Sequence, residues 1–190
     1  MQETDLLKKI ASGDVQAFKT LFESYQPSVF NLCYRFAKNR QEAEDLCQEV
    51  FFKIYLAAKT FRQQSKISTW IYRITINLCL NYKRRLNKLS FFSISDRTDE
   101  RKSLKESLVL AEENQPDHLV ELKEKEKIVQ AAINSLPKNQ RTALILQRYE
   151  NMSLQEIAQV MNSSVSSIQS RLARAKENLC QRLLPYLKNF

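Results

Sequence analysis

The chain has 190 residues, enough for two small domains, and its one glycine and four prolines are too few for the repeated turns of a β-rich fold. Its net charge of +9 is unevenly placed: +6 over residues 1–87, −3 over 88–126 and +6 over 127–190. Two basic segments separated by an acidic one suggest two nucleic-acid-facing domains joined by a linker.

The first basic segment has a helical pattern throughout. Asp14 follows a Ser-Gly turn where an N-cap residue would stand, and Pro27 suits the first turn of a further helix. The apolar spacing predicts these helices: a short one from Thr4 to the turn, one from Asp14, one opened by Pro27, one over about 41–59 and one over about 68–85. We expect them to form one bundle-like domain over residues 1–87.

The rest of the chain divides into a linker and a second helical domain. Residues 88–118 are rich in Ser, Asp and Glu, a composition typical of a flexible linker. Helical spacing resumes over residues 119–190, with a break at Leu136-Pro137 between helices over 119–134 and 139–150. The predicted fold class is therefore all-α: two small helical domains joined by a flexible linker, the second containing a helix-turn-helix.

The helix-turn-helix is predicted from the stretch LQEIAQVMNSSVSSIQSRLARAK, residues 154–176. Ala158 is small where the two helices would cross, Asn162 tolerates the positive φ of the turn, and Ile168 faces inward. Such a unit places its second helix in the DNA major groove. An ordinary amphipathic helix pair is the alternative. The outer face favours DNA because its short polar and guanidinium side chains reach bases and phosphates: Ser166, Ser167, Gln169, Ser170, Arg171 and Arg174.

The predicted helix over 41–59 has a second, outward face opposite its apolar one. Four side chains fall on it at helical spacing: Asp45, Gln48, Glu49 and Phe52. Acidic and amide groups beside an exposed aromatic ring are typical of a docking surface, although such a face can also be merely solvated.

The predicted loop over 60–67 and the helix after it mix aromatic, amide and cationic side chains. They include Phe61, Arg62, Lys66, Thr69, Trp70, Tyr72, Arg73, Asn77, Asn81, Lys83, Arg84 and Arg85. Single-stranded DNA binding uses this mixture, because aromatic rings stack on bases, amides bind base edges and cations bind phosphates. The alternative is that Trp70 and Tyr72 belong to the core.

No catalytic, metal or cofactor site is expected. Cys33, Cys47 and Cys79 fall on apolar helical stripes, and no pair of cysteines, Cys180 included, has metal-ligand spacing. The single histidine, His118, has no cysteine or second histidine near it and falls in the predicted linker. The chain begins with no charged-then-apolar leader and has no apolar run of about 18 residues, so we expect a cytoplasmic protein with no membrane span.

Three stretches together resemble bacterial RNA polymerase sigma factors of the extracytoplasmic-function group. They are EAEDLCQEVFFKIY, FRQQSKISTWIYRITIN and SLPKNQRTALILQRYENMSLQEIAQVM followed by SIQSRLARAK. The resemblance covers about residues 14–87, which match sigma region two, and 120–182, which match region four. It implies a promoter-recognition subunit whose partners are promoter DNA and the polymerase core, through the β′ clamp helices and the β flap.

The resemblance also implies roles for individual residues. The core-docking surface would be Asp45, Gln48, Glu49 and Phe52. The melted minus-ten element would be bound by Lys53, Phe61 and Asn77, with Arg62, Lys66 and Arg73 nearby. The duplex minus-thirty-five element would be bound by Ser166, Gln169, Ser170, Arg171 and Arg174.

The sequence departs from the family pattern at Gln63, where a glycine is usual, and at Gln169 and Ala173 of the recognition helix. These departures put the preferred bases in doubt. The second hypothesis is a freestanding helix-turn-helix regulator that binds duplex DNA as a dimer, and a nucleic-acid enzyme is a distant third. The sequence leaves open the promoter sequence, the genes controlled, the inducing signal and whether an anti-sigma protein binds the chain.

Overall fold

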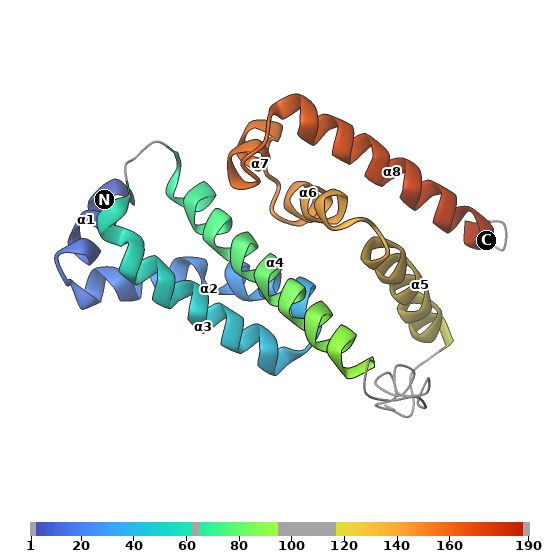
Figure 1. Cartoon of the computed structure of the whole chain (residues 1–190), viewed down its shortest axis with the longest axis horizontal. Coiled ribbons are helices and arrows are strands. Elements are labelled where there is room, and N and C mark those ends of the chain that lie inside the picture. The colour runs from blue at the N-terminus through green and yellow to red at the C-terminus, as the bar shows by residue number, and fades with distance from the viewer. Residues whose placement is uncertain (1–2, 62–64, 95–116, 188–190) are drawn as a thin grey trace.

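The computed structural model describes residues 3–61, 65–94 and 117–187, and within these ranges every regular element is a helix, as the sequence predicts (Figure 1). The helices are α1 (Glu3–Ala11), α2 (Val15–Ala37), α3 (Arg40–Ala57), the 3₁₀ turn η1 (Ala58–Thr60), α4 (Ile67–Ile94), α5 (Asp117–Asn134), α6 (Lys138–Tyr149), α7 (Leu154–Val160) and α8 (Val165–Leu187).

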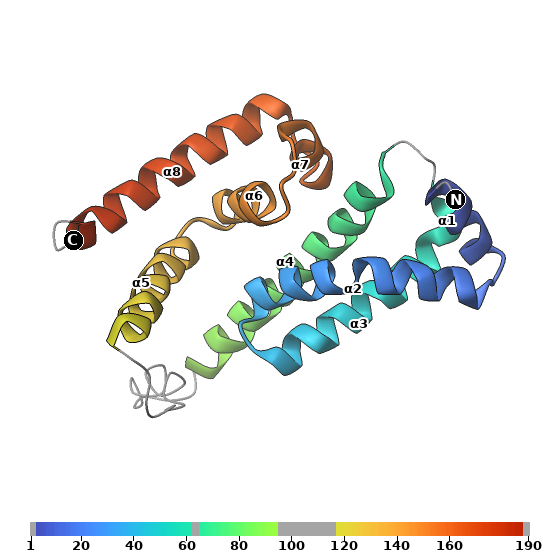
Figure 2. The same cartoon turned by 180° about the vertical axis from the view of Figure 1, so that it is seen from behind.

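The N-terminal group is a bundle in which α2, α3 and α4 pack on one another and α1 covers one end (Figures 1 and 2). Each helix contributes an apolar stripe that is removed from water. Phe36 of α2, Ile54 of α3 and Ile71 of α4 are fully buried in this core. Burial of each such side chain stabilises the fold by about 1.5–3 kcal/mol before the entropy cost of ordering it.

One continuous helix, α2, replaces the two helices that the sequence predicts around Pro27. The Asp14 N-cap is confirmed, since its carboxylate accepts a hydrogen bond from the Ala17 N–H at 3.0 Å. Pro27 lies inside the helix on its exposed side. Proline has no N–H, so the carbonyl four residues earlier in the helix loses its hydrogen bond, and on the exposed side water can bind that carbonyl instead. On the opposite side, Leu21 and Val29 stay fully buried.

The predicted linker over 88–118 is partly helical at both ends. Helix α4 continues to Ile94, beyond the predicted end near Arg85, and α5 begins at Asp117. His118 therefore lies in the first turn of α5 and not in the linker. Residues 95–116 lie outside the described residues.

The helix-turn-helix geometry is confirmed. Ala158 of α7 and Ile168 of α8 are buried where the helices cross, and Asn162 has a φ of 47°. The Ser163 N–H donates to the Ala158 carbonyl at 2.9 Å, a bond that closes the end of α7 when the intervening residue is left-handed. The angle between α7 and α8 is thus set within one turn of chain.

The two helical groups touch, because α7 lies against α4 (Figure 1). Buried residues of both groups belong to one hydrophobic cluster, which extends from Leu6 in α1 to Leu172 in α8. Among the described residues, no helix has the length and apolar character needed to cross a membrane.

The left-handed turn can be tested with two substitutions at one exposed position. Asn162→Ala should lower the free energy of unfolding by about 1 kcal/mol, because alanine adopts positive φ at a steric cost. Asn162→Gly should leave the stability nearly unchanged, since glycine adopts this conformation freely. Urea unfolding followed by circular dichroism measures both. Equal stability of the two variants would contradict this account of the turn.

Candidate nucleic-acid interface

The outer face of α3 is exposed along its length. Asp45, Gln48, Glu49 and Phe52 all lie on it, and Phe52 retains 63% of its accessible surface. Their direction follows from burial of the opposite stripe, which includes Val50. Two local contacts hold the carboxylates: the Gln41 amide donates to Asp45 at 3.4 Å, and Lys53 pairs with Glu49 at 3.6 Å.

This exposed face is larger than the sequence analysis predicted. Tyr55 and Leu56 are also exposed, and they follow Phe52 at spacings of three and four residues on the same helix. Three large apolar side chains in a row on an outer face are unusual for a helix that only meets water. The signal that could have found them is this spacing, which continues the predicted surface toward the end of α3.

The loop before α4 places one aromatic ring on another. The Phe61 ring lies 5.2 Å from the Trp70 ring, between centroids, and Phe61 is half-buried. Trp70 and Tyr72 are buried, so the alternative that they belong to the core is the correct one for these two residues. A cleft of about 320 Å³ beside Phe61 is also lined by Gln159, which comes from α7.

The exposed face of α4 carries two of the predicted residues. Arg73 and Asn77 are exposed one helical turn apart, and Lys53 projects from α3. Lys66 lies just before α4 and pairs with Glu156 of α7. Arg62 and Gln63 lie outside the described residues.

The predicted duplex-reading residues lie on α8. Ser166, Gln169, Ser170 and Arg174 are exposed. Arg171 differs from them, because it is half-buried and donates from Nη1 to the Ser163 hydroxyl at 3.0 Å. Part of its guanidinium is therefore committed to holding the turn between α7 and α8.

Glu156 makes hydrogen bonds both to a neighbouring residue, Ser153, and to a residue far away in the sequence, Lys66. One carboxylate oxygen accepts hydrogen bonds from the Ser153 N–H and hydroxyl, both at 2.9 Å, and the other meets the Lys66 ammonium at 2.8 Å. The Lys66 contact, followed by the Ser153 bonds, lowers the pKa of Glu156 to about 2. The Ser-x-x-Glu spacing is a capping-box signature that could have identified the local half of this arrangement from the sequence.

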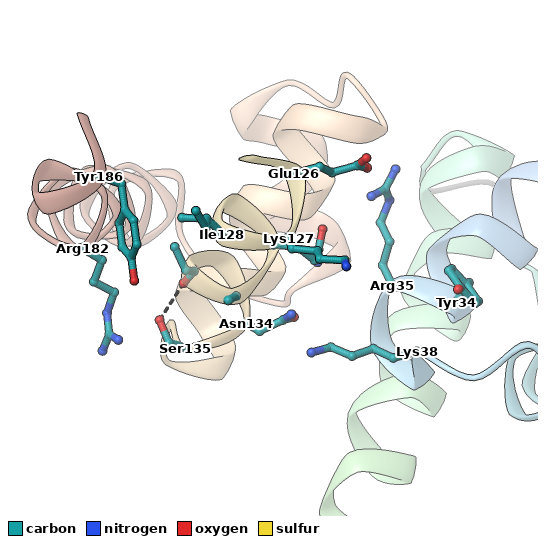
Figure 3. A pocket seen from close by; sticks show the side chains of 13 residues that line it. Tyr34, Arg35, Lys38, Glu126, Lys127, Ile128, Asn134, Ser135, Arg182 and Tyr186 are labelled. Atoms are coloured by element: carbon teal, nitrogen blue, oxygen red, sulfur yellow. Dashed lines mark hydrogen bonds between the residues drawn. The ribbon is translucent and has the colours of Figure 1, made fainter. Parts of the chain in front are cut away.

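A second cleft is lined by none of the predicted site residues. It has a volume of about 1,230 Å³ and lies between α2, α5 and α8. Figure 3 shows Arg35 of α2 extending toward Glu126 of α5, and Lys38, the residue after α2, extending toward Asn134. Burial, together with the charges of Lys83 and Arg141, lowers the pKa of Lys38.

Within the described parts of the chain, no group of side chains has the composition and proximity of a metal site. The thiols of Cys33 and Cys79 lie 3.9 Å apart in the core. This contact and burial raise the pKa of Cys33, and burial raises that of Cys47 to about 12. Cys33, Cys47 and Cys79 are all buried among the packed side chains of the core, whereas Cys180 is exposed on α8.

Two family matches cover most of the described chain. Residues 21–89 match Sigma-70 region 2, and residues 126–179 match Sigma-70, region 4. The RNA polymerase sigma-H factor of Pseudomonas aeruginosa is 35% identical over 98% of this chain and 96% of its own length. The ECF RNA polymerase sigma-E factor of Escherichia coli is 32% identical over 96% and 95%, respectively.

Solved structures show the same fold. CnrH in complex with the cytosolic domain of CnrY superposes with a TM-score of 0.67 at 20% identity, over 95% of this chain and 96% of that one. The sigma factor RpoE from Bartonella quintana, in complex with the anti-sigma factor NepR, gives 0.64 at 22% identity, over 89% and 98%.

The charge of Glu156 can be tested separately from its capping role. Glu156→Gln keeps an acceptor at the capping-box position but loses the ion pair. It should lower the free energy of unfolding by no more than about 1 kcal/mol near neutral pH, because Lys66 is largely exposed.

The difference between wild type and variant should depend on pH. The native pKa of Glu156 is depressed, so its charge stabilises the fold above the ordinary pKa near 4.5, and this contribution is lost as the pH falls toward about 2. Urea unfolding of both proteins across this range checks the sign. A stability difference that grows on acidification would contradict the assignment.

Proposed function

Because this chain belongs to the extracytoplasmic-function sigma factors, which are promoter-recognition subunits of bacterial RNA polymerase, we propose a division of that work among its exposed faces. The observation that carries the proposal is the pairing in one chain of a region-two bundle with a region-four helix-turn-helix. Each leaves outward a set of polar or aromatic side chains that its own core does not use.

The outer face of α3 is the proposed docking surface for the polymerase core. Asp45, Gln48, Glu49 and Phe52 would contact the β′ clamp helices, and the exposed Tyr55 and Leu56 extend this surface. Aromatic side chains that are exposed in the free protein are typical anchors of protein interfaces, because their burial on binding removes a large apolar area from water.

The loop and the exposed face of α4 are proposed to bind the melted minus-ten element. Phe61 has a half-buried ring that packs at a tilt of 57° against Trp70, and its accessible part would stack on a base. Arg73 and Asn77 stand one turn apart on α4, where a cation can meet a phosphate and an amide can meet a base edge. Lys53, Arg62 and Lys66 complete the proposed set.

The exposed face of α8 is proposed to enter the major groove of the minus-thirty-five element. Gln169, Ser170 and Arg174 would read bases or bind phosphates, and Ser166 lies in the first helical turn. Arg171 would contribute to a smaller degree, because its contact with Ser163 already uses part of its hydrogen-bonding capacity.

We further propose a cytoplasmic protein without enzymatic activity of its own, which works with the polymerase core and contacts its β flap through region four. An anti-sigma protein is a proposed additional partner, as NepR is for the Bartonella quintana RpoE. A dimeric helix-turn-helix regulator is not favoured, because such a protein needs no sigma region two, whereas residues 21–89 of this chain match that region.

Transcription with purified core polymerase tests the function directly. The template is fragmented genomic DNA of the source bacterium, and sequencing of the 5′ ends of the RNA identifies the transcription start sites. We expect a discrete set of starts that requires this chain. Transcription indistinguishable from that of core polymerase alone would refute the function.

The docking surface predicts a loss of core affinity on substitution. Asp45→Ala combined with Phe52→Ala should weaken binding to the polymerase core by at least about 1–2 kcal/mol, because both side chains would be interface anchors. Both are exposed, so the helical circular dichroism should not change. Fluorescence anisotropy with labelled chain measures the affinity, with Lys19→Ala on α2 as an exposed control. Unchanged core affinity would exclude this face.

The two DNA contacts should separate at different steps of initiation. Phe61→Ala removes a stacking surface worth about 1–3 kcal/mol per base and should impair promoter opening while sparing closed binding. Arg174→Ala should weaken closed binding and be tolerated on a template melted in advance, because duplex recognition is then dispensable. Permanganate footprinting on duplex and pre-melted templates distinguishes them. Equal defects of Arg174→Ala on both templates would contradict the division.

A further inference from the structure

Three cationic side chains line the part of the second cleft that lies between α2 and α5. Arg35 belongs to α2, Lys38 follows directly after that helix, and Lys127 comes from α5. Figure 3 shows the three side chains extending into the space between these helices. The Arg35 guanidinium has a fixed position, because it lies over the Tyr149 ring at 3.4 Å from the ring centroid. The cleft therefore presents one oriented guanidinium and two ammonium groups.

Two further cations adjoin these three. Arg141 of α6 donates from Nη1 to the carbonyl of Asn134 at 3.4 Å, and Asn134 lines the cleft. Lys83 of α4 is near as well, since burial, followed by the charges of Lys83 and Arg141, lowers the pKa of Lys38. Burial is also the main cause that lowers the pKa values of Lys83 and Arg141. Five like charges from different helices thus gather here at a cost of mutual repulsion.

The folded chain does not neutralise this group of cations. Glu126 lines the cleft and Glu42 lies near Lys83, but among the described residues neither carboxylate forms an ion pair with any of the five. In the same part of the chain, the Nε–H groups of Arg35 and Arg141 are buried and have no hydrogen-bond partner. Buried polar groups are normally paired, so unpaired guanidinium N–H groups beside a cleft indicate a ligand that supplies acceptor oxygens.

Charge and geometry favour linked phosphates as this ligand. A single phosphate carries about −1.5 to −2 charges, so two or more are needed to balance five cations against two carboxylates. A guanidinium binds a phosphate through two parallel hydrogen bonds, and an ammonium binds it as a point charge. The cleft volume of about 1,230 Å³ also leaves room for a nucleoside. Tyr34 lines the cleft and is 47% exposed, so its ring is accessible to a base.

We propose that the α2–α5 side of this cleft binds a chain of linked phosphates, either free or carried by a nucleoside triphosphate, through Arg35, Lys38 and Lys127. Arg141 and Lys83 add positive charge to the site. The proposal goes beyond promoter recognition, because none of these five residues belongs to the surfaces proposed for the polymerase core or for DNA. Since α2 lies in the region-two match and Lys127 in the region-four match, a bound chain would bridge the two regions.

Isothermal titration calorimetry of the full chain tests the site at physiological ionic strength and without divalent cations. The probes are inorganic tripolyphosphate, ATP, AMP and a single-stranded oligonucleotide of mixed sequence. We expect tripolyphosphate and ATP to bind with one-to-one stoichiometry, and AMP to bind at least about tenfold more weakly, because one phosphate reaches fewer of the cations. Absence of tripolyphosphate and ATP binding at millimolar concentration would overturn the proposal.

Two charge-matched double variants separate a defined site from general attraction to a basic protein. Lys38→Gln with Lys127→Gln removes two exposed cations of the cleft. Lys9→Gln with Lys59→Gln removes the same charge from exposed positions on α1 and η1 that do not line the cleft. The cleft variant should bind tripolyphosphate at least about tenfold more weakly than the control variant, because it loses two charge-assisted contacts. Equal affinities of the two variants would refute a site here.

The remaining arms identify the source of the phosphates. If Tyr34→Ala weakens ATP binding but not tripolyphosphate binding, the natural ligand carries a base. If ATP and tripolyphosphate bind equally and Tyr34→Ala changes neither, the ligand is a free phosphate chain. If the cleft variant loses more affinity for the oligonucleotide than for tripolyphosphate, the cleft binds a nucleic-acid strand and the proposal is wrong. Should the double variant lose helical circular dichroism, Lys127→Gln alone decides between site and general attraction.

Discussion

Each long helix of the region-two bundle has to bury one apolar stripe, and this requirement fixes which side chains remain on its outer face. In α3, Val50 and Ile54 are fully buried on one side of the helix. Gln48 and Phe52 lie on the other side and therefore face outward. Turning the helix by a single residue would expose side chains whose burial stabilises the fold by about 1.5–3 kcal/mol each. The proposed polymerase-binding and strand-binding faces are therefore held in place by the core beneath them.

In region four the decisive constraint is a single turn of backbone. The left-handed Asn162 ends α7, and the small Ala158 lets α8 cross it closely. Arg171 reinforces this corner through Ser163, so a residue that the pattern suggests for DNA also supports the turn. The direction in which α8 presents Gln169 and Arg174 depends on this corner more than on any distant contact.

The contact between the two helical groups differs in kind from the cores. It combines a shared apolar cluster with polar contacts, in which the carboxylates of Glu156 in α7 and of Glu150, just after α6, meet Lys66 and Tyr72. Cations that bind DNA phosphates are equally able to bind carboxylates, and both interactions weaken with salt. The surface proposed for the promoter strand therefore also binds acidic side chains of its own chain.

Local pattern determined the helices, the left-handed Asn162, the outward face of α3 and the family, because periodicity and turn chemistry are properties of neighbouring residues. Tertiary structure alone decided what depends on packing. It carried α2 unbroken through Pro27, where the exposed side of the helix tolerates the lost hydrogen bond, and it made Tyr72 a buried partner of Glu150. It also paired Lys66 with Glu156 across 90 residues. No repeat or spacing in a sequence encodes such a pair, because it exists only where two separately folded surfaces meet.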